Sequence, residues 1–328
     1  MDLTNLTQGL SDLHVVTIVW FTAALTGARL LFIRMPGQAV RAVVEVVEAA
    51  LIAGVLVFLV IQPFVVKAFY IPSGSMLPTL IEDDHILVSR FIYRLHPPEH
   101  EDVVVFNAPP QALAQTAETT QGDEHIDYIK RLIGLPGDTI VVHGGYIVIN
   151  NQRYQHDDVR PYFSLSATDP NSKDEQHLKF TDNGVSVYDG KKWTNYTPSE
   201  VAQKIDGSAS ASIKIYPGYV VRNGERLDEP YFAEDPDYDM KLAPDGDVVL
   251  SDPSDGGTRI NGIVPDPETM VQIDKSPPGQ VPSGELIVMG DNRNDSNDSS
   301  RWGPLTEDRL VGRAVCIFYP FARVQQIR

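Results

Sequence analysis

The sequence predicts a mainly β domain preceded by two membrane-spanning helices. Two uniformly apolar stretches near the N-terminus predict the helices, and short alternating segments after residue 66 predict the strands. Gly, Pro and Asp separate these segments, as is typical of turns. The formal net charge of −17 argues against nucleic acid as a partner, because binding phosphates requires a basic surface.

The apolar stretches cover residues 15–33 and 49–66. Both are long enough for the roughly 30 Å hydrocarbon core of a bilayer, and the only charged residue in either is Arg29. Buried core helices are the alternative, but two long runs so close together favour membrane spans. A cleaved signal peptide would begin with a basic region, whereas Asp2 and Asp12 precede the first stretch.

The arginines predict the orientation of these spans. Arg29, Arg34 and Arg41 lie at or between the two stretches, and basic residues favour the cytoplasmic side. The N-terminus and the chain from residue 67 onward are therefore expected outside the cytoplasm. The lipid bilayer is accordingly an expected partner.

Six later segments alternate apolar and polar residues as strands do. They are residues 85–95, 102–109, 127–135, 138–150, 284–291 and 310–320. In the fourth, Gly144 and Gly145 predict a tight hairpin turn, because such turns need positive φ angles. We find no segment of useful length with helical periodicity after residue 66.

A change of composition predicts the domain organisation. Asp, Gly, Pro, Ser and Asn are enriched over residues 151–283, which indicates an inserted subdomain of short strands and loops. The expected division is a membrane anchor over 1–66, a β-core over 67–150 and 284–328, and this insertion. The single cysteine, Cys316, excludes an internal disulfide.

A proline-flanked loop, YIPSGSMLPTL, covers residues 70–80 just beyond the second apolar stretch. Pro72, Gly74 and Pro78 favour a compact turn, which can hold a serine hydroxyl and a backbone N–H toward a substrate carbonyl. An ordinary turn is the alternative interpretation. On its own, therefore, the loop does not identify a catalytic serine.

Lys130 and Arg131 interrupt an otherwise apolar segment, YIKRLIGLPGD, over residues 128–138. Because side chains alternate along a strand, these two point to opposite sides and one of them can face the interior. Burial lowers the pKa of a lysine, so that its neutral amine becomes available as a general base. A charged edge strand that discourages aggregation is the alternative.

Asp, Asn, Ser and Arg are concentrated in MGDNRNDSNDSSRWGPL, residues 289–305, after a predicted strand. The segment resembles a calcium-binding loop in composition, but it lacks the glycine and terminal glutamate of the helix-loop-helix pattern. A hydrogen-bonded structural loop is the preferred interpretation. Accordingly, no metal and no other cofactor is expected.

Together, the three motif segments resemble the bacterial type I signal peptidase family, also called leader peptidases. The resemblance covers both apolar stretches, the three segments and the last predicted strand, in the same order and with similar local spacing. It implies a signal-peptidase-like β-fold in an extracytoplasmic catalytic domain attached to the cytoplasmic (inner) membrane. The implied activity is serine endopeptidase removal of N-terminal signal peptides from exported preproteins, through a Ser-Lys dyad and an acyl-enzyme.

The resemblance also assigns residues. It places the nucleophile at Ser75, its general base at Lys130, an oxyanion donor at Ser73 and a lysine-orienting hydroxyl at Ser296. The backbone N–H of Ser75 is expected to complete the oxyanion hole. The other assigned residues support the acidic loop or bind substrate: Asp291, Arg293 and Asp298 for the loop, and Pro72 and Met76 for the substrate.

These residue types suffice for the chemistry. Ser75 Oγ would attack a peptide carbonyl, and Lys130 would take the hydroxyl proton and return it to the leaving amine. No histidine or carboxylate is needed. Activity is expected to rise with pH through a lowered lysine pKa.

Two segments depart from the family pattern. His100–Asp102 replaces the usual basic-Gly-Asp before a strand, which affects the local turn rather than the chemistry. Ser300 stands where an arginine usually follows the Asp-Ser pair, and Arg301 comes one residue later. An ion pair between Arg301 and Asp298 would therefore need a changed geometry.

Two other functions fit parts of the sequence. Self-cleaving repressors also use Ser-x-Met and a lysine, but they are soluble and carry a DNA-binding module. A catalytically silent, membrane-tethered β-domain that binds peptides or a secretion complex is the alternative from a different class; retention of Ser75 and Lys130 favours the enzyme. The expected partners are therefore signal-peptide-bearing preproteins, the bilayer and the secretion translocon, but not nucleic acid.

Overall fold

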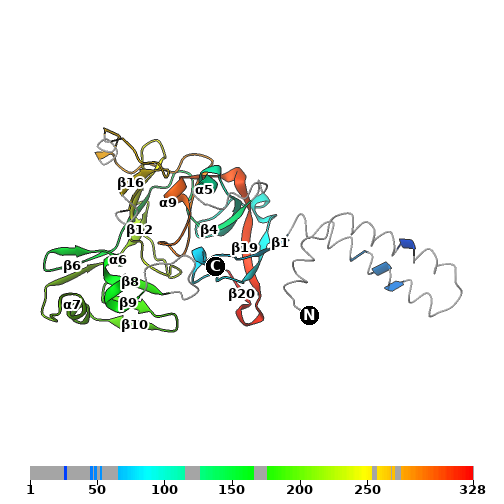
Figure 1. Cartoon of the computed structure of the whole chain (residues 1–328). Helices are drawn as coiled ribbons and strands as arrows, with labels where there is room; N and C mark the ends of the chain where they lie inside the picture. The colour runs from blue at the N-terminus through cyan, green and yellow to red at the C-terminus, as the bar shows by residue number, and fades with distance from the viewer. Residues whose placement is uncertain are drawn as a thin grey trace. The chain divides into compact units, whose positions relative to one another are not determined.

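The computed structural model (Figure 1) describes residues 26–27, 45–46, 48–49, 52–53, 66–114, 126–165, 176–252, 257–266, 268–269 and 275–327. Within these ranges, every helix is too short or too polar to cross a bilayer. The predicted spans over 15–33 and 49–66 lie almost entirely outside the described residues.

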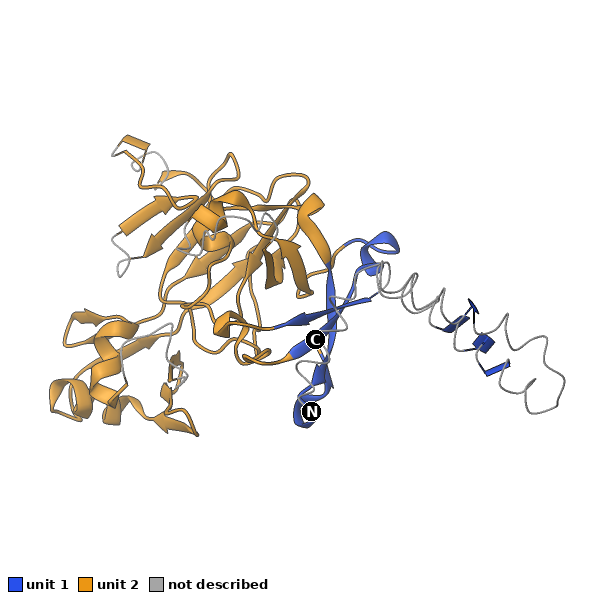
Figure 2. Cartoon of the chain, turned by 45° about the vertical axis from the view of Figure 1, so that its right-hand side comes forward, with its two compact units in different colours: residues 1–70, 85–97, 312–326 blue, residues 71–84, 98–311, 327–328 orange. Residues whose placement is uncertain are grey.

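The described chain is mainly β, as the sequence predicts, and it divides into two compact units (Figure 2). The smaller unit comprises Met1–Tyr70, His85–Pro97 and Gly312–Gln326. Its strands pair antiparallel in the order β1, β2, β19 and β20. Their bounds are β1 Val66–Tyr70, β2 His85–Ser89, β19 Leu310–Tyr319 and β20 Gln325–Gln326, with the 3₁₀ turns η3 Ile92–Arg94 and η6 Phe321–Arg323.

The larger unit contains the strand that carries Lys130 and Arg131. This strand, β4, pairs antiparallel with β3 on one side and β17 on the other, and β17 pairs with β18. The bounds are β3 Val103–Asn107, β4 Asp127–Gly134, β17 Glu285–Met289 and β18 Leu305–Thr306. The predicted strand segments 102–109, 127–135 and 284–291 are thus confirmed, as are parts of 85–95 and 310–320 in the smaller unit.

A second sheet of the larger unit has the order β13-β12-β5-β14-β15-β16. Its strands are β5 Ile140–His143, β12 Tyr219–Arg222, β13 Glu225–Arg226, β14 Asp239–Leu242, β15 Val248–Asp252 and β16 Gly257–Ile260. Buried apolar side chains of this sheet pack with Ile133 of β4 and with Ile287 and Met289 of β17 in one core. The sheet therefore supports the strands that carry the candidate site.

A second core lies among two three-stranded sheets, of order β10-β9-β8 and β11-β6-β7. Their strands are β6 Tyr146–Ile149, β7 Gln152–Tyr154, β8 His177–Thr181, β9 Gly184–Tyr188, β10 Trp193–Tyr196 and β11 Ile213–Tyr216. Short helices α6 His156–Val159 and η4 Arg160–Phe163 adjoin them. Residues 151–283 thus contribute to two cores, because β12, β14 and β15 belong to the first.

The predicted hairpin at Gly144 and Gly145 is wrong. β5 and β6 do not pair; β5 joins β12 and β14, whereas β6 joins β7 and β11. Glycine is needed here because neighbouring groups lie close to the backbone: a Cβ on Gly145 would collide with the Asp235 carboxylate. The chain therefore passes here from one sheet to another.

The sequence analysis also missed helix α7, Pro198–Asp206. Thr197 and Glu200 form a capping box, Pro198 occupies the first turn, and Gly207 ends the helix at φ 77°. These four residues are start and stop signals of a helix, and they do not depend on apolar periodicity. Further short helices in the described part of the chain are η2 Gly74–Met76, α5 Pro110–Ala114, α9 Ser299–Trp302 and η5 Glu307–Arg309.

Candidate active site

The serine loop forms a single 3₁₀ turn, η2, with Ser75 at its centre. The Leu77 N–H donates to the Gly74 carbonyl at 3.1 Å, and the Met76 side chain is fully buried beneath the loop. Pro72 and Ser73 are exposed, whereas Ser75 is half-buried. The turn thus fixes Ser75 at the surface and Met76 in the interior.

Asn292 holds this loop in place. Its backbone N–H donates to the Ser75 carbonyl at 3.1 Å, and its Nδ2 donates to the Gly74 carbonyl at 3.2 Å. Gly290 allows this approach, because a Cβ there would come within 2.5 Å of the Ser75 carbonyl oxygen. Asn292 was not among the predicted site residues. The only indication of its role in the sequence is its position directly after Asp291 in the acidic loop.

Lys130 reaches Ser75 from strand β4. Its Nζ donates to Ser75 Oγ at 2.7 Å and to the Ile129 carbonyl at 2.9 Å, and the residue is only 4% exposed. Burial lowers the pKa of Lys130 to about 8, although nearby carboxylates, Asp298 first among them, act to raise it. A substantial fraction of the amine is therefore neutral in slightly alkaline solution.

Arg131 is buried with Asp291, so both Lys130 and Arg131 are buried, whereas the sequence led us to expect one of the two side chains in the interior. Its Nε and Nη2 donate to the two oxygens of Asp291 at 2.7 and 2.6 Å, and the Asp291 carboxylate also accepts from Thr79 Oγ1. The ring of Tyr231 covers the guanidinium, 3.9 Å from its Cζ. This bidentate pair joins β4 to the acidic loop and to the end of the serine loop.

Arg293 ties the acidic loop to residues outside the predicted motifs. Its Nε donates to the Gly290 carbonyl at 2.9 Å, and its guanidinium pairs with the buried carboxylate of Glu229. Tyr231 also donates to Glu229, at 3.2 Å. Glu229 lies in the segment predicted as an insertion, and nothing in the local sequence pattern indicates its contact with Arg293.

Asp298 shapes the end of the acidic loop. Its carboxylate accepts from the Gly290 N–H at 2.8 Å and from the Ser300 N–H and hydroxyl at 3.0 and 2.7 Å, which caps α9. Arg301 reaches Asp252, at 4.0 Å. Ser300 thus donates hydrogen bonds to Asp298 from the position where the family pattern has an arginine.

The hydrogen bond expected from Ser296 to Lys130 is not formed in this structure. Ser296 is 5% exposed, and its Oγ has no hydrogen-bond partner within the described part of the chain. The Ile129 carbonyl orients the Lys130 amine instead. Among the described residues, no group of three or more His, Cys, Asp or Glu side chains is arranged to hold a metal ion.

The fold and this site together define a class of protein. A serine on an exposed turn, hydrogen-bonded to a buried lysine with a lowered pKa, is the arrangement of a serine hydrolase that uses an amine as its general base. It is built here on a mainly β domain.

Comparison with known proteins agrees with this class. The family described as "Signal peptidase, peptidase S26" matches residues 43–195 and 202–319, so the chain belongs to that family. It is 33% identical over 274 residues to the "Probable signal peptidase I-2" of Synechocystis sp., covering 84% of this chain and 72% of the relative. It is 29% identical over 268 residues to the "Signal peptidase I" of Buchnera aphidicola subsp. Acyrthosiphon pisum, covering 81% and 72%.

A third relative is the "Signal peptidase I" of Aquifex aeolicus. The identity is 27% over 281 residues, which cover 84% of this chain and 83% of that protein. The matches thus extend over most of both chains rather than over the motif segments alone.

Proposed function

We propose that Ser75 and Lys130 are the catalytic dyad of this chain, which, as a member of peptidase family S26, is a serine endopeptidase that removes signal peptides from preproteins. The observation that carries the proposal is the 2.7 Å hydrogen bond between Lys130 Nζ and Ser75 Oγ. A silent peptide-binding domain is not favoured, because it would have no use for a buried amine beside a serine.

The reaction proceeds in two halves. In the first, Ser75 Oγ bonds to the scissile carbonyl carbon while its proton passes to the neutral Lys130 amine. The C–N bond then breaks, Lys130 gives the proton to the leaving amine, and an ester links the signal peptide to Ser75. In the second half, Lys130 takes a proton from water as the water oxygen attacks the ester carbonyl. The bond to Ser75 Oγ then breaks, Lys130 returns the proton to Oγ, and the signal peptide leaves with a new C-terminal carboxyl group.

The developing oxyanion requires donors in the serine loop. The N–H groups at the start of a helical turn have no acceptor within it, which makes the Ser75 N–H available. The exposed hydroxyl of Ser73 is the second donor that we assign, and exposed Pro72 is a contact for substrate. We also assign Met76 to the substrate site, as the buried floor of this loop.

Ser296 has the role of stabilising protonated Lys130. Its buried hydroxyl has no partner in the described residues, and it can therefore accept a hydrogen bond when the amine gains a proton. Asp291, Arg293 and Asp298 support this loop through the contacts described above. No cofactor takes part in the proposed reaction.

Signal peptidases of this type are membrane-associated, and we propose two spans, over residues 15–33 and 49–66, with the N-terminus and the β-domain outside the cytoplasm. The apolar length of these segments and the arginines between them support this topology. Ser75 then follows the second span by nine residues (75 − 66), which suits cleavage of preproteins as they leave a translocon. The division into 1–66, a catalytic core and the insertion 151–283 stays a prediction.

The test uses the full chain in detergent with a preprotein substrate. Ser75→Ala and Lys130→Ala should each abolish cleavage, whereas Lys214→Ala, which replaces an exposed lysine of β11, should not. Cleavage that survives Ser75→Ala would overturn the assignment. Mass spectrometry of the products shows whether the cut removes an N-terminal signal peptide.

A further inference from the structure

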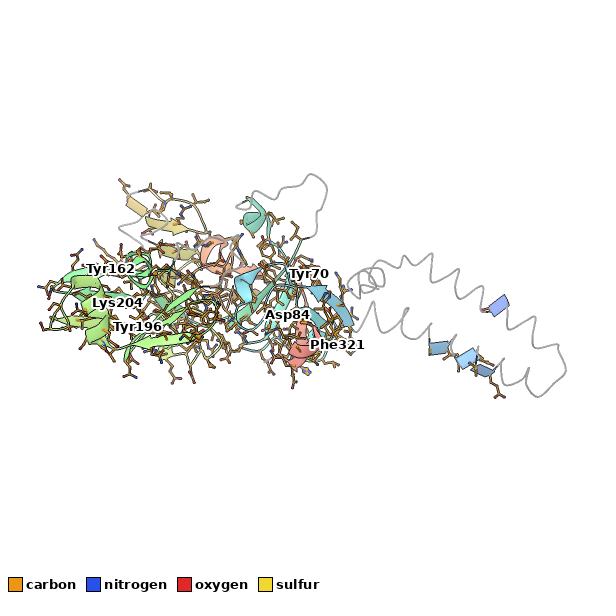
Figure 3. All side chains as sticks on the ribbon, turned by 60° about the horizontal axis from the view of Figure 1, so that its bottom comes forward. Tyr70, Asp84, Tyr162, Tyr196, Lys204 and Phe321 are labelled. Atoms are coloured by element: carbon orange, nitrogen blue, oxygen red, sulfur yellow. The ribbon has the colours of Figure 1, made fainter. Side chains whose placement is uncertain are left out.

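A buried group of charges lies beside the second core of the larger unit. Leu178 and Phe180 of β8 belong to this core, and Tyr196, labelled in Figure 3, packs against it. Glu234 and Asp235, which precede β14, are only 2% and 1% exposed. Burying carboxylates is costly unless cations and N–H donors surround them, so the donors show which elements this pair joins.

Glu234 binds a strand of the second core and a helix beside it. Its carboxylate accepts hydrogen bonds from Nη2 of Arg160, in η4, at 2.6 and 2.7 Å, and from the Leu178 N–H at 2.6 Å. Burial acts to raise the pKa of Glu234, but His177 and Arg160 lower it to about 2. Glu234 is therefore an anion, and among the described residues each of its hydrogen-bond partners is a donor.

Asp235 binds the same part of the chain. Its Oδ1 accepts from the Phe180 N–H at 2.7 Å and lies 2.9 Å from His156 Nε2, and its Oδ2 accepts from the Gly218 N–H at 2.7 Å. The His156 ring is stacked on that of Phe180, with 4.1 Å between the ring centroids. Glu234 and Asp235 are thus fixed by α6, η4 and β8.

Asn294 connects the acidic loop to these two carboxylate residues. Its Nδ2 donates to the Glu234 carboxylate at 3.0 Å and to the Asp235 carbonyl at 3.1 Å, and its Oδ1 accepts from the Asp237 N–H at 3.0 Å. Both ends of the amide are used, so the three partners allow only one orientation of it.

A further hydrogen bond joins the same stretch of chain to an earlier residue of the acidic loop. The Ala233 N–H donates to the Asp291 carbonyl at 3.1 Å. Asn292, which holds the Ser75 carbonyl, lies between Asp291 and Asn294 in the sequence. The part of the acidic loop that contacts the serine loop is therefore fixed on both sides of Asn292.

We propose that Asn294 is a positioning residue of the catalytic site, and that the second core holds the serine loop in place through it. The proposal rests on the proposed function, because it gives the predicted insertion a part in the same reaction. Asn294 acts through Asn292: without the bonds to Glu234 and Asp235, this stretch of the acidic loop moves, and the Ser75 carbonyl moves with it. A displaced serine hydroxyl reacts more slowly, because the rate depends on its placement against the scissile carbonyl.

The test exchanges donor and acceptor between two residues of the full-length enzyme. Asn294→Asp keeps the shape of the side chain but places a carboxylate against that of Glu234, and we expect kcat for preprotein cleavage to fall about tenfold. Glu234→Gln alone places an amide NH₂ group among donors, so kcat should fall as well. In the double variant the glutamine amide can donate to the new carboxylate, and the total charge is unchanged. Its kcat should recover to within about threefold of the unmodified value.

Asn150→Asp is the matched control. Asn150 Nδ2 donates to the Asp206 carboxylate at 3.1 Å, and its Oδ1 accepts from the Ser212 N–H at 3.3 Å. This amide therefore also joins a carboxylate to a backbone N–H, but within the described chain it binds no residue of the acidic loop. Its kcat should equal that of the unmodified enzyme. The control separates a new carboxylate pair elsewhere in the domain from one that includes the acidic loop.

Two further measurements separate positioning from folding. Urea denaturation shows whether each variant is folded under the assay conditions, so that kcat refers to folded enzyme. Should the added carboxylate prevent folding, Asn294→Ala removes the amide without adding charge, and kcat should fall about fivefold. Hydrogen exchange gives a readout without cleavage: peptides that cover residues 70–80 and 289–298 should exchange faster in Asn294→Asp and return to the original rate in the double variant.

The outcomes distinguish the two proposals. Unchanged kcat in folded Asn294→Asp or Asn294→Ala, in an enzyme whose cleavage depends on Ser75, refutes the positioning role alone. A double variant that is as slow as Asn294→Asp also refutes it, because the loss then does not depend on the contact with Glu234. Faster exchange in Asn294→Asp that the double variant restores, in a chain that cleaves no preprotein, refutes the proposed function alone.

Discussion

Lys130 and Arg131 are consecutive residues of β4, and both side chains are buried. They leave the strand on opposite faces, because successive strand residues alternate. Lys130 donates to a serine hydroxyl and a carbonyl, whereas Arg131 donates to both oxygens of Asp291. One face of β4 thus holds an amine whose charge is disfavoured, and the other holds a guanidinium whose charge is compensated.

The pH dependence of cleavage follows from Lys130. Burial lowers its pKa to about 8, and only the neutral amine can accept the Ser75 proton. The population of neutral amine grows as the pH rises, so kcat/KM should increase about tenfold per pH unit below the pKa and level off above it. Steady-state kinetics from about pH 6 to 10 measures this profile.

Lys214→Ala is the control for this profile. It replaces an exposed lysine of β11 that takes no part in the site. The rise in kcat/KM should keep its midpoint in the variant. A flat profile through pH 8, or a midpoint that moves in Lys214→Ala, contradicts Lys130 as the titrating base.

Asp291→Asn tests the other face of β4. The substitution leaves the fully buried Arg131 without its anion, so the free energy of unfolding should fall by about 3–5 kcal/mol. Urea denaturation measures the difference. Asp295→Asn is the control in the same loop: burial raises the pKa of Asp295, so a neutral amide should cost less than about 1 kcal/mol. If Asp291→Asn is as stable as the unmodified protein, the folding stability does not depend on the ion pair between Arg131 and Asp291.

The local sequence pattern was sufficient to predict the strands of the site, but not the contacts between its side chains. Alternating β-branched residues identify β3, β4 and β17, because each buries apolar side chains in a sheet. Alternation also separates Lys130 from Arg131. The approach of Lys130 to Ser75 across 55 positions could be expected only from the family resemblance, since no local pattern encodes it.

Other features depend on tertiary packing that a sequence pattern does not contain. The predicted turn at Gly144 and Gly145 failed because those glycines provide room for neighbouring backbone and for Asp235 rather than positive φ angles. Glu229 is buried against Arg293, which lies 64 positions away. The exception is α7, whose capping box was present in the sequence and could have been recognised.

Glu229→Gln tests whether Glu229, which lies outside the three motif segments, holds the acidic loop in place. The change leaves Arg293 buried without a carboxylate, and the Gly290 carbonyl that Arg293 binds should move. We expect kcat/KM to fall about tenfold as the loop loosens its hold on Ser75. Glu225→Gln, an exposed change in β13, is the control and should retain full activity. Unchanged kcat/KM in Glu229→Gln would show that this pair does not position the loop.

Ser296→Ala separates a role in catalysis from a role in folding. Its buried Oγ has no hydrogen-bond partner in the described residues, so its removal should leave the free energy of unfolding unchanged or raise it by about 1 kcal/mol. If the hydroxyl accepts a hydrogen bond from protonated Lys130 during the reaction, as we propose, kcat should fall about tenfold. Urea denaturation and single-turnover kinetics measure the two effects.

Ser299→Ala should show the opposite pattern. Ser299 Oγ accepts a 3.0 Å hydrogen bond from the Val288 N–H in the same region, and both groups are buried. Its removal should lower the free energy of unfolding by about 1–3 kcal/mol and leave kcat near its original value, because the Val288 N–H loses its acceptor. If Ser296→Ala also lowers stability and keeps kcat, the hydroxyl of Ser296 has a structural role, and the Ile129 carbonyl alone orients the base.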